Sequence, residues 1–387
     1  MYRNPRFVLI GNPENRRVSF FQQALQQAGQ EPALVISYLD MLDNADLLNK
    51  LTGNLPAGDI IVRIESPGEN FEVEKRILAL GGLEDALDLE DQRGRIYHPR
   101  RWFKGFTCLM ASVAKQFEQD WQGRRGGQGG RLGWFNHPAD ILSMFDKPAC
   151  KKILQPYTLP VFPVFSCYEE FFSFVKEQQY CRFFIKLNSS SSASGVVAYE
   201  YNKTNGRELA YSTVEVVSGM DGDRYFNSLK VKKYTSAGMI GNVLDFLFEQ
   251  GALVERWIPK ARHEDSSYDL RIMGIGGQRR HAIARLSRGP MTNLHLGNQR
   301  CAVDELELSS ATWADIDTLV EQCMQAFPRS LYAGLDVLIP RDGGLPVLLE
   351  ANAFGDLLPN LLHNEESTYL AEINAVLKRR EEAYACH

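Results

Sequence analysis

The stretch LYAGLDVLIPRDGGLPVLLEANAF, residues 331–354, contains two apolar runs that are separated by a turn sequence. A three-residue loop at 342–344 would use its glycines for positive φ angles and would join the two runs as a β-hairpin. In that hairpin Asp336 lies directly opposite Glu350, and side chains that are directly opposed share one face of the sheet. A change of one residue in the register would move Asp336 to the other face.

The same register pairs Arg341 with Leu345 beside the loop, and it places Asn352 on the face of Asp336 and Glu350. Opposed carboxylates repel each other, and a hard cation such as Mg²⁺ relieves the repulsion because it binds carboxylate oxygens. The alternative is a solvated sheet face on which the charges stay apart. We favour a metal site, because these three polar residues interrupt strands that are otherwise apolar.

Length and composition indicate a globular protein of two or three domains. The chain has 387 residues, 44% of them hydrophobic, and a formal net charge of -5. This mild acidity gives no support for bulk binding of nucleic acid. The seven cysteines are odd in number and form no CxxC pair, so neither a disulfide framework nor a zinc site is indicated. The N-terminal apolar run is too short for a signal peptide, and no run is long enough to span a bilayer. We therefore expect a cytoplasmic protein.

The first third of the chain reads as an α/β domain. The apolar run 7–10, a helical pattern that ends near Gly29 and a second apolar run form a βαβ opening without a GxGxxG motif. The α/β pattern continues to about residue 120. The glycine-rich segment 122–134 is then predicted as a surface loop that ends the domain; a mobile flap over an anionic substrate is the alternative.

A serine-rich segment follows Lys186 in FFIKLNSSSSASGVVAYE, residues 183–200. It could be a solvated linker, or it could be a loop whose small residues let backbone N–H groups approach an anion. Taken alone, Lys186 reads as a lysine at a strand end that reaches solvent. Arg271 and Arg285 also lie among apolar residues, and a buried arginine needs an anion. For either arginine, a structural ion pair with Asp269 or another carboxylate is an alternative to a role in catalysis.

These motifs and their order resemble the ATP-grasp superfamily, in particular the branch with glutathione synthetase, D-alanine–D-alanine ligase and the ribosomal-protein glutamate ligases. VLLEANAF and GLDVLI resemble the metal-binding strands of that family, and SMFDKPACKKIL resembles its lysine-bearing helix. FIKLNSSSSASGVV resembles its phosphate loop, although leucine and serine replace the usual proline and first glycine. ALVERWIP resembles the hinge behind adenine, and the two arginine strands with MTNLHLGN resemble the stretch between hinge and metal site. The resemblance covers about residues 136–362.

The resemblance implies an α/β fold with α+β lobes, in which an N-terminal βαβ domain precedes two ATP-grasp subdomains that clamp a nucleotide. The implied domains are 1–135, 136–252 for nucleotide binding, and 253–387 for metal binding. The implied ligands are ATP and Mg²⁺ or Mn²⁺. The implied metal ligands are Asp336, Glu350 and Asn352. The implied ATP-binding residues are Lys147, Lys186, Ser191, Ser192, Gly195, Glu255, Arg256, Trp257 and Ile258. Arg285 and Arg271 are implied as catalytic, and Asn293 and His295 as substrate-binding. Glu264 and Asp265 are both candidates for the ribose contact.

The implied activity is an ATP-dependent ligase that joins a carboxylate to an amine, or to a thiol, through an acyl phosphate. The expected partners are small-molecule or peptide carboxylates and amines, with no nucleic acid and no membrane; homo-oligomerisation stays open. A kinase that phosphorylates a small-molecule hydroxyl could use the same nucleotide site. A module that binds ATP without turnover is the third hypothesis, and the retained acids and both arginines argue against it.

Overall fold

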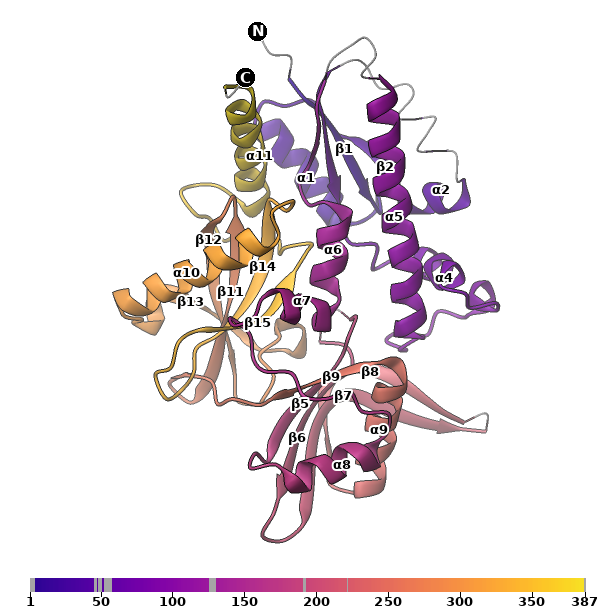
Figure 1. Cartoon of the computed structure of the whole chain (residues 1–387), viewed down its shortest axis with the longest axis vertical. Helices are drawn as coiled ribbons and strands as arrows, with labels where there is room; N and C mark the ends of the chain where they lie inside the picture. The colour runs from indigo at the N-terminus through magenta and orange to yellow at the C-terminus, as the bar shows by residue number, and fades with distance from the viewer. Residues whose placement is uncertain are drawn as a thin grey trace.

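The computed structural model describes residues 4–44, 47, 51, 58–124, 130–190, 193–220 and 222–385. It has three sheets, each with its own helices (Figure 1). In the view of Figure 1 the N-terminal domain lies at the upper right, a C-terminal lobe at the left and a central lobe at the bottom. The mixture of parallel and antiparallel sheets agrees with the α/β fold class predicted from the sequence.

The N-terminal domain is built on a parallel sheet of order β2-β1-β3-β4. Its four strands read as short apolar runs because helices and the C-terminal lobe cover them. The predicted βαβ opening is present, and Gly29 follows the first helix with a φ of 66°. The strands are β1 (Arg6–Gly11), β2 (Leu34–Ser37), β3 (Ile60–Ile64) and β4 (Leu132–Trp134), and the helices are α1 (Arg16–Gln27), α2 (Tyr38–Asp43), α4 (Phe71–Leu80), η1 (Ala86–Asp88) and α5 (Pro99–Arg124).

The glycine-rich segment 122–134 is shorter as a loop than the sequence predicts. Helix α5 continues to Arg124, and β4 begins at Leu132 as the edge strand of the N-terminal sheet. Residues 125–129 lie outside the described part of the chain. The flap that was the alternative for this segment would fall on those residues, and it stays a prediction.

The central lobe is an antiparallel sheet of order β8-β7-β6-β5-β9. Two helices cover one face with a core of aromatic and aliphatic side chains, and the other face looks toward the C-terminal lobe. Strand β9 belongs to this sheet, which extends past the predicted boundary at residue 252. The elements are α8 (Tyr168–Glu177), β5 (Arg182–Leu187), β6 (Val196–Asn202), β7 (Arg207–Gly219), β8 (Gly222–Tyr234), α9 (Ala237–Gln250) and β9 (Ala252–Arg256).

The C-terminal lobe is an antiparallel sheet of order β13-β12-β11-β14-β15, with β10 beside β11. Helix α10 packs on its apolar face, and α11 packs against α1 of the N-terminal domain. The strands are β10 (Arg262–His263), β11 (Ser266–Ile275), β12 (Gln278–Ser287), β13 (Gln299–Ala302), β14 (Tyr332–Leu338) and β15 (Val347–Asn352). The helices are η2 (Leu294–Leu296), η3 (Val303–Leu306), α10 (Ser310–Ala326) and α11 (Thr368–Ala385).

Two short helices, α6 (Pro138–Phe145) and α7 (Lys147–Ile153), replace the single predicted helix and meet at Asp146. Both pack on β15 of the C-terminal lobe. The six cysteines that the structure describes are free thiols. Within the described residues, no helix is both long and apolar enough to cross a bilayer.

Candidate active site

Three charged side chains form a row across the C-terminal sheet. Glu350 on β15 pairs with Asp336 on β14, and Asp336 pairs with Arg271 on β11. Asn352 lies two residues beyond Glu350 and donates a 3.0 Å hydrogen bond to the carbonyl of Gly334. The period-2 pattern of the sequence thus places the three predicted metal ligands on neighbouring positions of one sheet face.

The register of this hairpin differs from the prediction at its loop end. Leu338 pairs with Val347, so the loop is longer than three residues and Arg341 does not pair with Leu345. A β-bulge at Leu349 then shifts the ladder by one residue and brings Asp336 opposite Glu350. Bulges of this kind bend a strand and redirect one side chain, and they are common beside active sites.

Asp336 is held between two guanidinium groups. Its Oδ1 lies 3.1 Å from Nε of Arg271, and its Oδ2 lies 3.0 Å from Nη2 of Arg285. The Oδ1 atom is buried and makes no hydrogen bond with the described residues. Its charge is balanced by the ion pair with Arg271, and a carboxylate oxygen is also a ligand of the kind that a hard metal cation binds.

Arg285 pairs with Asp336 on one side and with Asp269 on the other, where Nε donates a 2.8 Å hydrogen bond to Oδ1. Oδ2 of Asp269 also accepts a hydrogen bond from Lys260 at 2.8 Å and one from the Thr292 hydroxyl. Burial alone would raise the pKa of Asp269, but Arg285 and Lys260 outweigh it and hold that pKa well below its usual range. The ion pair with Asp269 that was the structural alternative for Arg285 therefore exists, and it fixes the guanidinium beside Asp336.

Lys147 begins α7 and points into the same region. Its ammonium donates a 2.7 Å hydrogen bond to the carbonyl of Ser190 and lies 3.8 Å from Oε1 of Glu350. Burial, together with the nearby charge of Lys186, lowers the pKa of Lys147 although Glu350 opposes the shift. The nearby carboxylates only partly balance the positive charges of Lys147 and Lys186. These two ammonium groups therefore favour the binding of an anion.

Glu255 on β9 binds two of the lysines. Its carboxylate lies 2.8 Å from the ammonium of Lys151 and forms a second ion pair with Lys186. Burial would raise the pKa of Glu255, but both lysines outweigh it and lower the pKa to about 2. The sequence suggested Glu255 as a contact for the edge of adenine; in the structure its carboxylate is committed to Lys151 and Lys186.

These groups line one pocket between the central and C-terminal lobes. Eleven of the sixteen predicted site residues line it: Lys147, Lys186, Glu255, Arg256, Ile258, Arg271, Arg285, Asn293, Asp336, Glu350 and Asn352. Trp257, Gly195 and His295 do not. Trp257 packs on Phe184 with ring centroids 5.3 Å apart, Gly195 packs against Leu187, and His295 is exposed in η2. Ser191 and Ser192 lie outside the described residues.

The prediction missed three lining or supporting groups, namely Lys151, Lys260 and Thr292. Lys151 had a local signal, because it follows Lys147 by four residues on one helix and i, i+4 side chains share a face. Lys260 and Thr292 reach the site through the pairing of strands that are distant in sequence. Glu264 and Asp265, the two candidates for a ribose contact, do not line this pocket.

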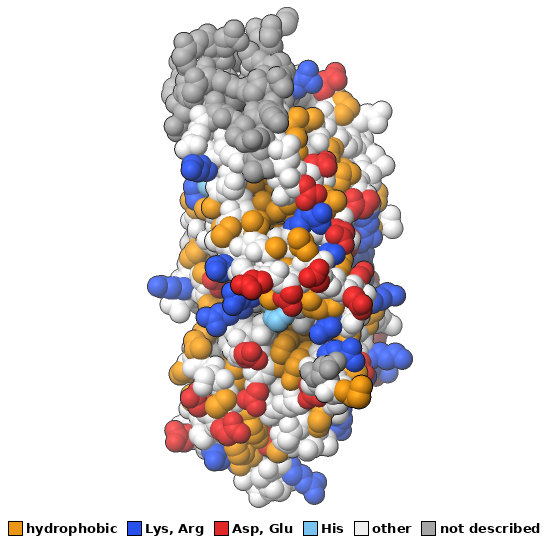
Figure 2. Space-filling model, turned by 90° about the vertical axis from the view of Figure 1, so that its right-hand side faces the viewer, with side chains coloured by type: hydrophobic (Ala, Val, Ile, Leu, Met, Phe, Trp, Pro, Cys, Tyr) orange, Lys and Arg blue, Asp and Glu red, His pale blue; other side chains and the backbone are white. Residues whose placement is uncertain are grey.

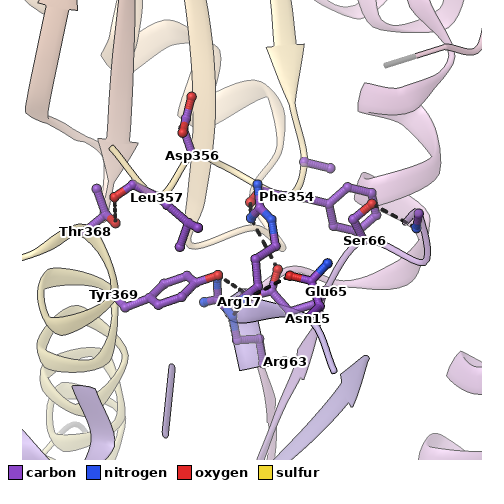
Figure 3. A network of polar contacts seen from close by, with 12 residues as sticks. Asn15, Arg17, Arg63, Glu65, Ser66, Phe354, Asp356, Leu357, Thr368 and Tyr369 are labelled. Carbon is purple, nitrogen blue, oxygen red and sulfur yellow. Dashed lines mark hydrogen bonds and ion pairs between the residues drawn. The ribbon is translucent and has the colours of Figure 1, made fainter. Parts of the chain in front are cut away.

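The N-terminal domain anchors the segment that follows β15 (Figure 3). Arg17 on α1 donates a 2.9 Å hydrogen bond to the carbonyl of Phe354, two residues after Asn352, and lies 3.4 Å from Glu65. Glu65 in turn accepts hydrogen bonds from Arg63 and Tyr369, both at 2.7 Å. Although burial raises the pKa of Glu65, Arg63 and Arg17 lower it overall, so the carboxylate is ionised in this network.

Comparison with known proteins finds similarity in structure alone, because neither a family model nor a curated protein sequence matches the chain. The D-cycloserine synthetase DcsG superposes with a TM-score of 0.53 at 13% identity, over 96% of this chain and 99% of the other. The macrocyclase MdnC of Microcystis aeruginosa MRC, bound to the precursor peptide MdnA, gives a TM-score of 0.51 at 14% identity, over 96% and 99%.

The D-alanine–D-alanine ligase of Bacillus anthracis also gives a TM-score of 0.51, at 12% identity, over 98% of this chain and 100% of the other. The similarity covers all three parts of the chain, and it includes the antiparallel lobes on either side of the charged pocket. The chain therefore has the fold of the ATP-grasp ligases.

Proposed function

We propose that this protein is an ATP-dependent ligase that joins a carboxylate to an amine through an acyl phosphate. The observation that carries the proposal is the meeting of Asp336 and Glu350 across the bulged hairpin, beside two buried lysines in one pocket. Opposed carboxylates next to ammonium groups suit a metal-bound polyphosphate, since the acids take the cation and the lysines take the phosphate oxygens.

The residues present fit a magnesium ion. Asp336 and Glu350 offer carboxylate oxygens, the Oδ1 of Asp336 is buried without a hydrogen bond, and Asn352 offers a carboxamide. Lys147 and Lys186 lower the pKa of Glu350 more than burial raises it, so it is ionised at neutral pH. When bound there, Mg²⁺ supplies charge neutralisation for the phosphoryl group in transit. Mn²⁺ has similar ligand preferences and remains an option.

Lys147 and Lys186 would contact the phosphates of ATP, with backbone groups of the 188–195 loop. The main chain of Arg256 to Ile258 would face adenine, and Arg285 would stabilise charge on the transferred phosphoryl group. The pocket has a volume of about 110 Å³. Ligand sites commonly measure about 300–1,000 Å³, so nucleotide binding requires the two lobes to move apart.

The proposed chemistry overcomes the poor electrophilicity of a carboxylate. A carboxylate oxygen of the substrate attacks the γ-phosphorus, the bond to the β–γ bridging oxygen breaks, and ADP leaves. The amine nitrogen then attacks the carbonyl carbon, phosphate leaves and the nitrogen loses a proton. The chain contributes position and charge to both steps and needs no covalent enzyme intermediate. Since similar folds occur in a D-cycloserine synthetase and a peptide macrocyclase, both small-molecule and peptide carboxylates are within the proposal.

Two measurements test this function. Binding of MgATP at a hundredfold excess over its dissociation constant should stabilise the fold by about 2.7 kcal/mol, and thermal melting would detect it. Hydroxylamine should trap an acyl phosphate as a hydroxamate once a carboxylate substrate is supplied. A phosphate ester without hydroxamate would identify a kinase, ATP binding without turnover of any supplied substrate would identify a sensor, and no binding of MgATP would reject the nucleotide site.

A further inference from the structure

A second cavity opens beside the proposed catalytic pocket. Its volume is about 860 Å³, and it lies between the sheet of the central lobe and the segment after β12. Lys260, Pro290 and Met291 line both cavities, so the two spaces are continuous along one wall. We call the second cavity the basic groove. None of the groups proposed to take metal or phosphate lines the basic groove, so it needs another occupant.

The basic groove is strongly cationic. Of its twenty lining residues, one is acidic, Asp265, and seven are basic: Arg182, Lys230, Lys233, Lys260, Arg262, Arg288 and Arg341. Five of these, at positions 230, 233, 262, 288 and 341, have no carboxylate within ion-pair distance in the described part of the chain. The whole chain carries a net charge of -5, and on the face in Figure 2 acidic and basic side chains are interspersed. A cavity that is lined mainly by positive charges favours a polyanionic ligand.

The wall of the basic groove includes an edge strand with exposed apolar side chains. β8 lies at the end of its sheet, and on it Leu229 is 59% and Val231 38% exposed. Near its other end the outer edge of β8 pairs with the segment 94–96, through hydrogen bonds at Asn227 and Tyr225. Between Asn227 and Lys232 a bulge interrupts the ladder to β7, and within it the N–H of Lys230 donates a hydrogen bond to the hydroxyl of Ser228. The exposed side chains of Leu229 and Val231 therefore project from a bulge at the wall of the basic groove.

The basic lining and the exposed apolar side chains together favour an extended peptide over other polyanions as the ligand of the groove. Acidic side chains of a peptide match the lysines and arginines of the groove, and its aliphatic side chains can pack on Leu229 and Val231. A nucleic acid would match the positive charge but offers no aliphatic side chains to these two residues. We propose that the basic groove binds an extended peptide segment rich in Asp and Glu and guides one of its carboxylates into the adjoining pocket. This substrate class rests on the ligase function proposed above.

The test uses fluorescein-labelled peptides and the full-length protein. A decapeptide of alternating Glu and Ala should raise the fluorescence anisotropy on binding, whereas the same peptide with Gln in place of Glu should bind at least about tenfold more weakly. The variant Lys230→Ala/Lys233→Ala should lose about tenfold in affinity for the acidic peptide. The control Lys176→Ala/Lys203→Ala removes two charges outside the basic groove, on α8 and in the β6–β7 turn, and should bind like the parent.

The outcomes separate the basic groove from the ligase function. Equal binding of the acidic and neutral peptides, or equal losses in the two double variants, would overturn the groove proposal. Tighter binding of a single-stranded oligonucleotide with the same number of charges would also overturn it. MgATP affinity is measured in parallel and should be the same in all variants. If MgATP binds but the peptide does not, the groove proposal fails alone; if the peptide binds but MgATP does not, the ligase function fails and the groove remains.

Discussion

The carboxylate of Glu255 joins Lys151 on α7 to Lys186 on β5 through two ion pairs inside the protein. Both lysines are largely buried, and so is Glu255. The acid therefore holds Lys186 at the wall of the pocket in one position, where a phosphate of the proposed nucleotide would compete for it. Lys151 is a positioning residue in this arrangement. Its positive charge neutralises part of the negative charge of Glu255, and this weakens the attraction between Glu255 and Lys186.

The variant Lys151→Met tests this relationship. Removal of one cation leaves Glu255 with an uncompensated charge that binds Lys186 more tightly and repels phosphate. We expect the dissociation constant for MgATP to rise roughly tenfold, which corresponds to about 1.4 kcal/mol. Titration calorimetry would measure it, with Lys152→Met as the control because Lys152 is exposed on the same helix. Unchanged affinity in a folded Lys151→Met protein would restrict Lys151 to a structural role.

The variant Glu350→Gln should abolish ATP turnover and keep the fold. The substitution preserves size but removes one negative charge from the proposed metal site, so Asp336 and residue 350 would hold a bound Mg²⁺ less firmly. The assay is substrate-dependent release of ADP, or intrinsic ATPase activity, with circular dichroism as the folding control. Glu321→Gln on the exposed side of α10 should change stability by less than about 0.5 kcal/mol and leave activity intact. Parent-level turnover in folded Glu350→Gln would remove the metal assignment.

Local sequence patterns predicted many residues of the candidate site, but they did not predict all of its geometry. Alternation along two apolar strands was enough to put Asp336 and Glu350 on one face, and apolar flanks marked Arg285 as buried. The bulge at Leu349 had no local signal, because a bulge depends on how the loop end of the hairpin packs. The predicted register was therefore wrong beside the loop and right at the carboxylates.

Contacts between distant parts of the chain could not be predicted in this way. Glu255 meets Lys186 because β9 pairs with β5, and a single sequence does not reveal which strands become neighbours. Arg17 on α1 donates a hydrogen bond to the carbonyl of Phe354, which lies 337 positions later in the sequence. A single sequence does not reveal this contact either. Lys151 is the exception, since its spacing from Lys147 was visible on one helix.

The buried ion-pair network around Arg63 should contribute strongly to stability. Arg63 is fully buried and pairs with Glu65 at 2.7 Å and Glu372 at 2.6 Å, so it joins β3 to α11. Removal of one partner from a buried ion pair commonly costs about 3–5 kcal/mol, because it leaves a buried charge uncompensated. We expect that loss for Arg63→Met in urea unfolding, against about 0–1 kcal/mol for Arg76→Met, whose ion pairs are exposed. Similar losses in the two variants would contradict this account.

Asp59 gives the stability of the protein a dependence on acid pH. It precedes β3 and is 7% exposed; it binds the Tyr384 hydroxyl and Arg380 of α11, and the backbone N–H of Arg131. Burial would raise the pKa of Asp59, but these partners outweigh it and lower the pKa below the ordinary value of 3.8. The unfolded chain then binds more protons near that pH than the folded chain does. The stabilisation is therefore complete above the unfolded pKa and is lost as the pH falls through the folded pKa.

The variant Asp59→Asn should accordingly flatten the acid side of the stability profile. We expect its free energy of unfolding to lie roughly 1–3 kcal/mol below that of the parent at pH 7, the cost of breaking a buried charged hydrogen-bond group. The difference should shrink as the pH falls from about 5 toward 2, because protonation removes the same charge from the parent. Urea unfolding at a series of pH values measures both curves, with Asp88→Asn as the control because its carboxyl is exposed and makes no ion pair with a described residue. A constant difference between parent and Asp59→Asn across the whole range would mean that the ionised carboxylate does not bind α11 more tightly than the protonated one.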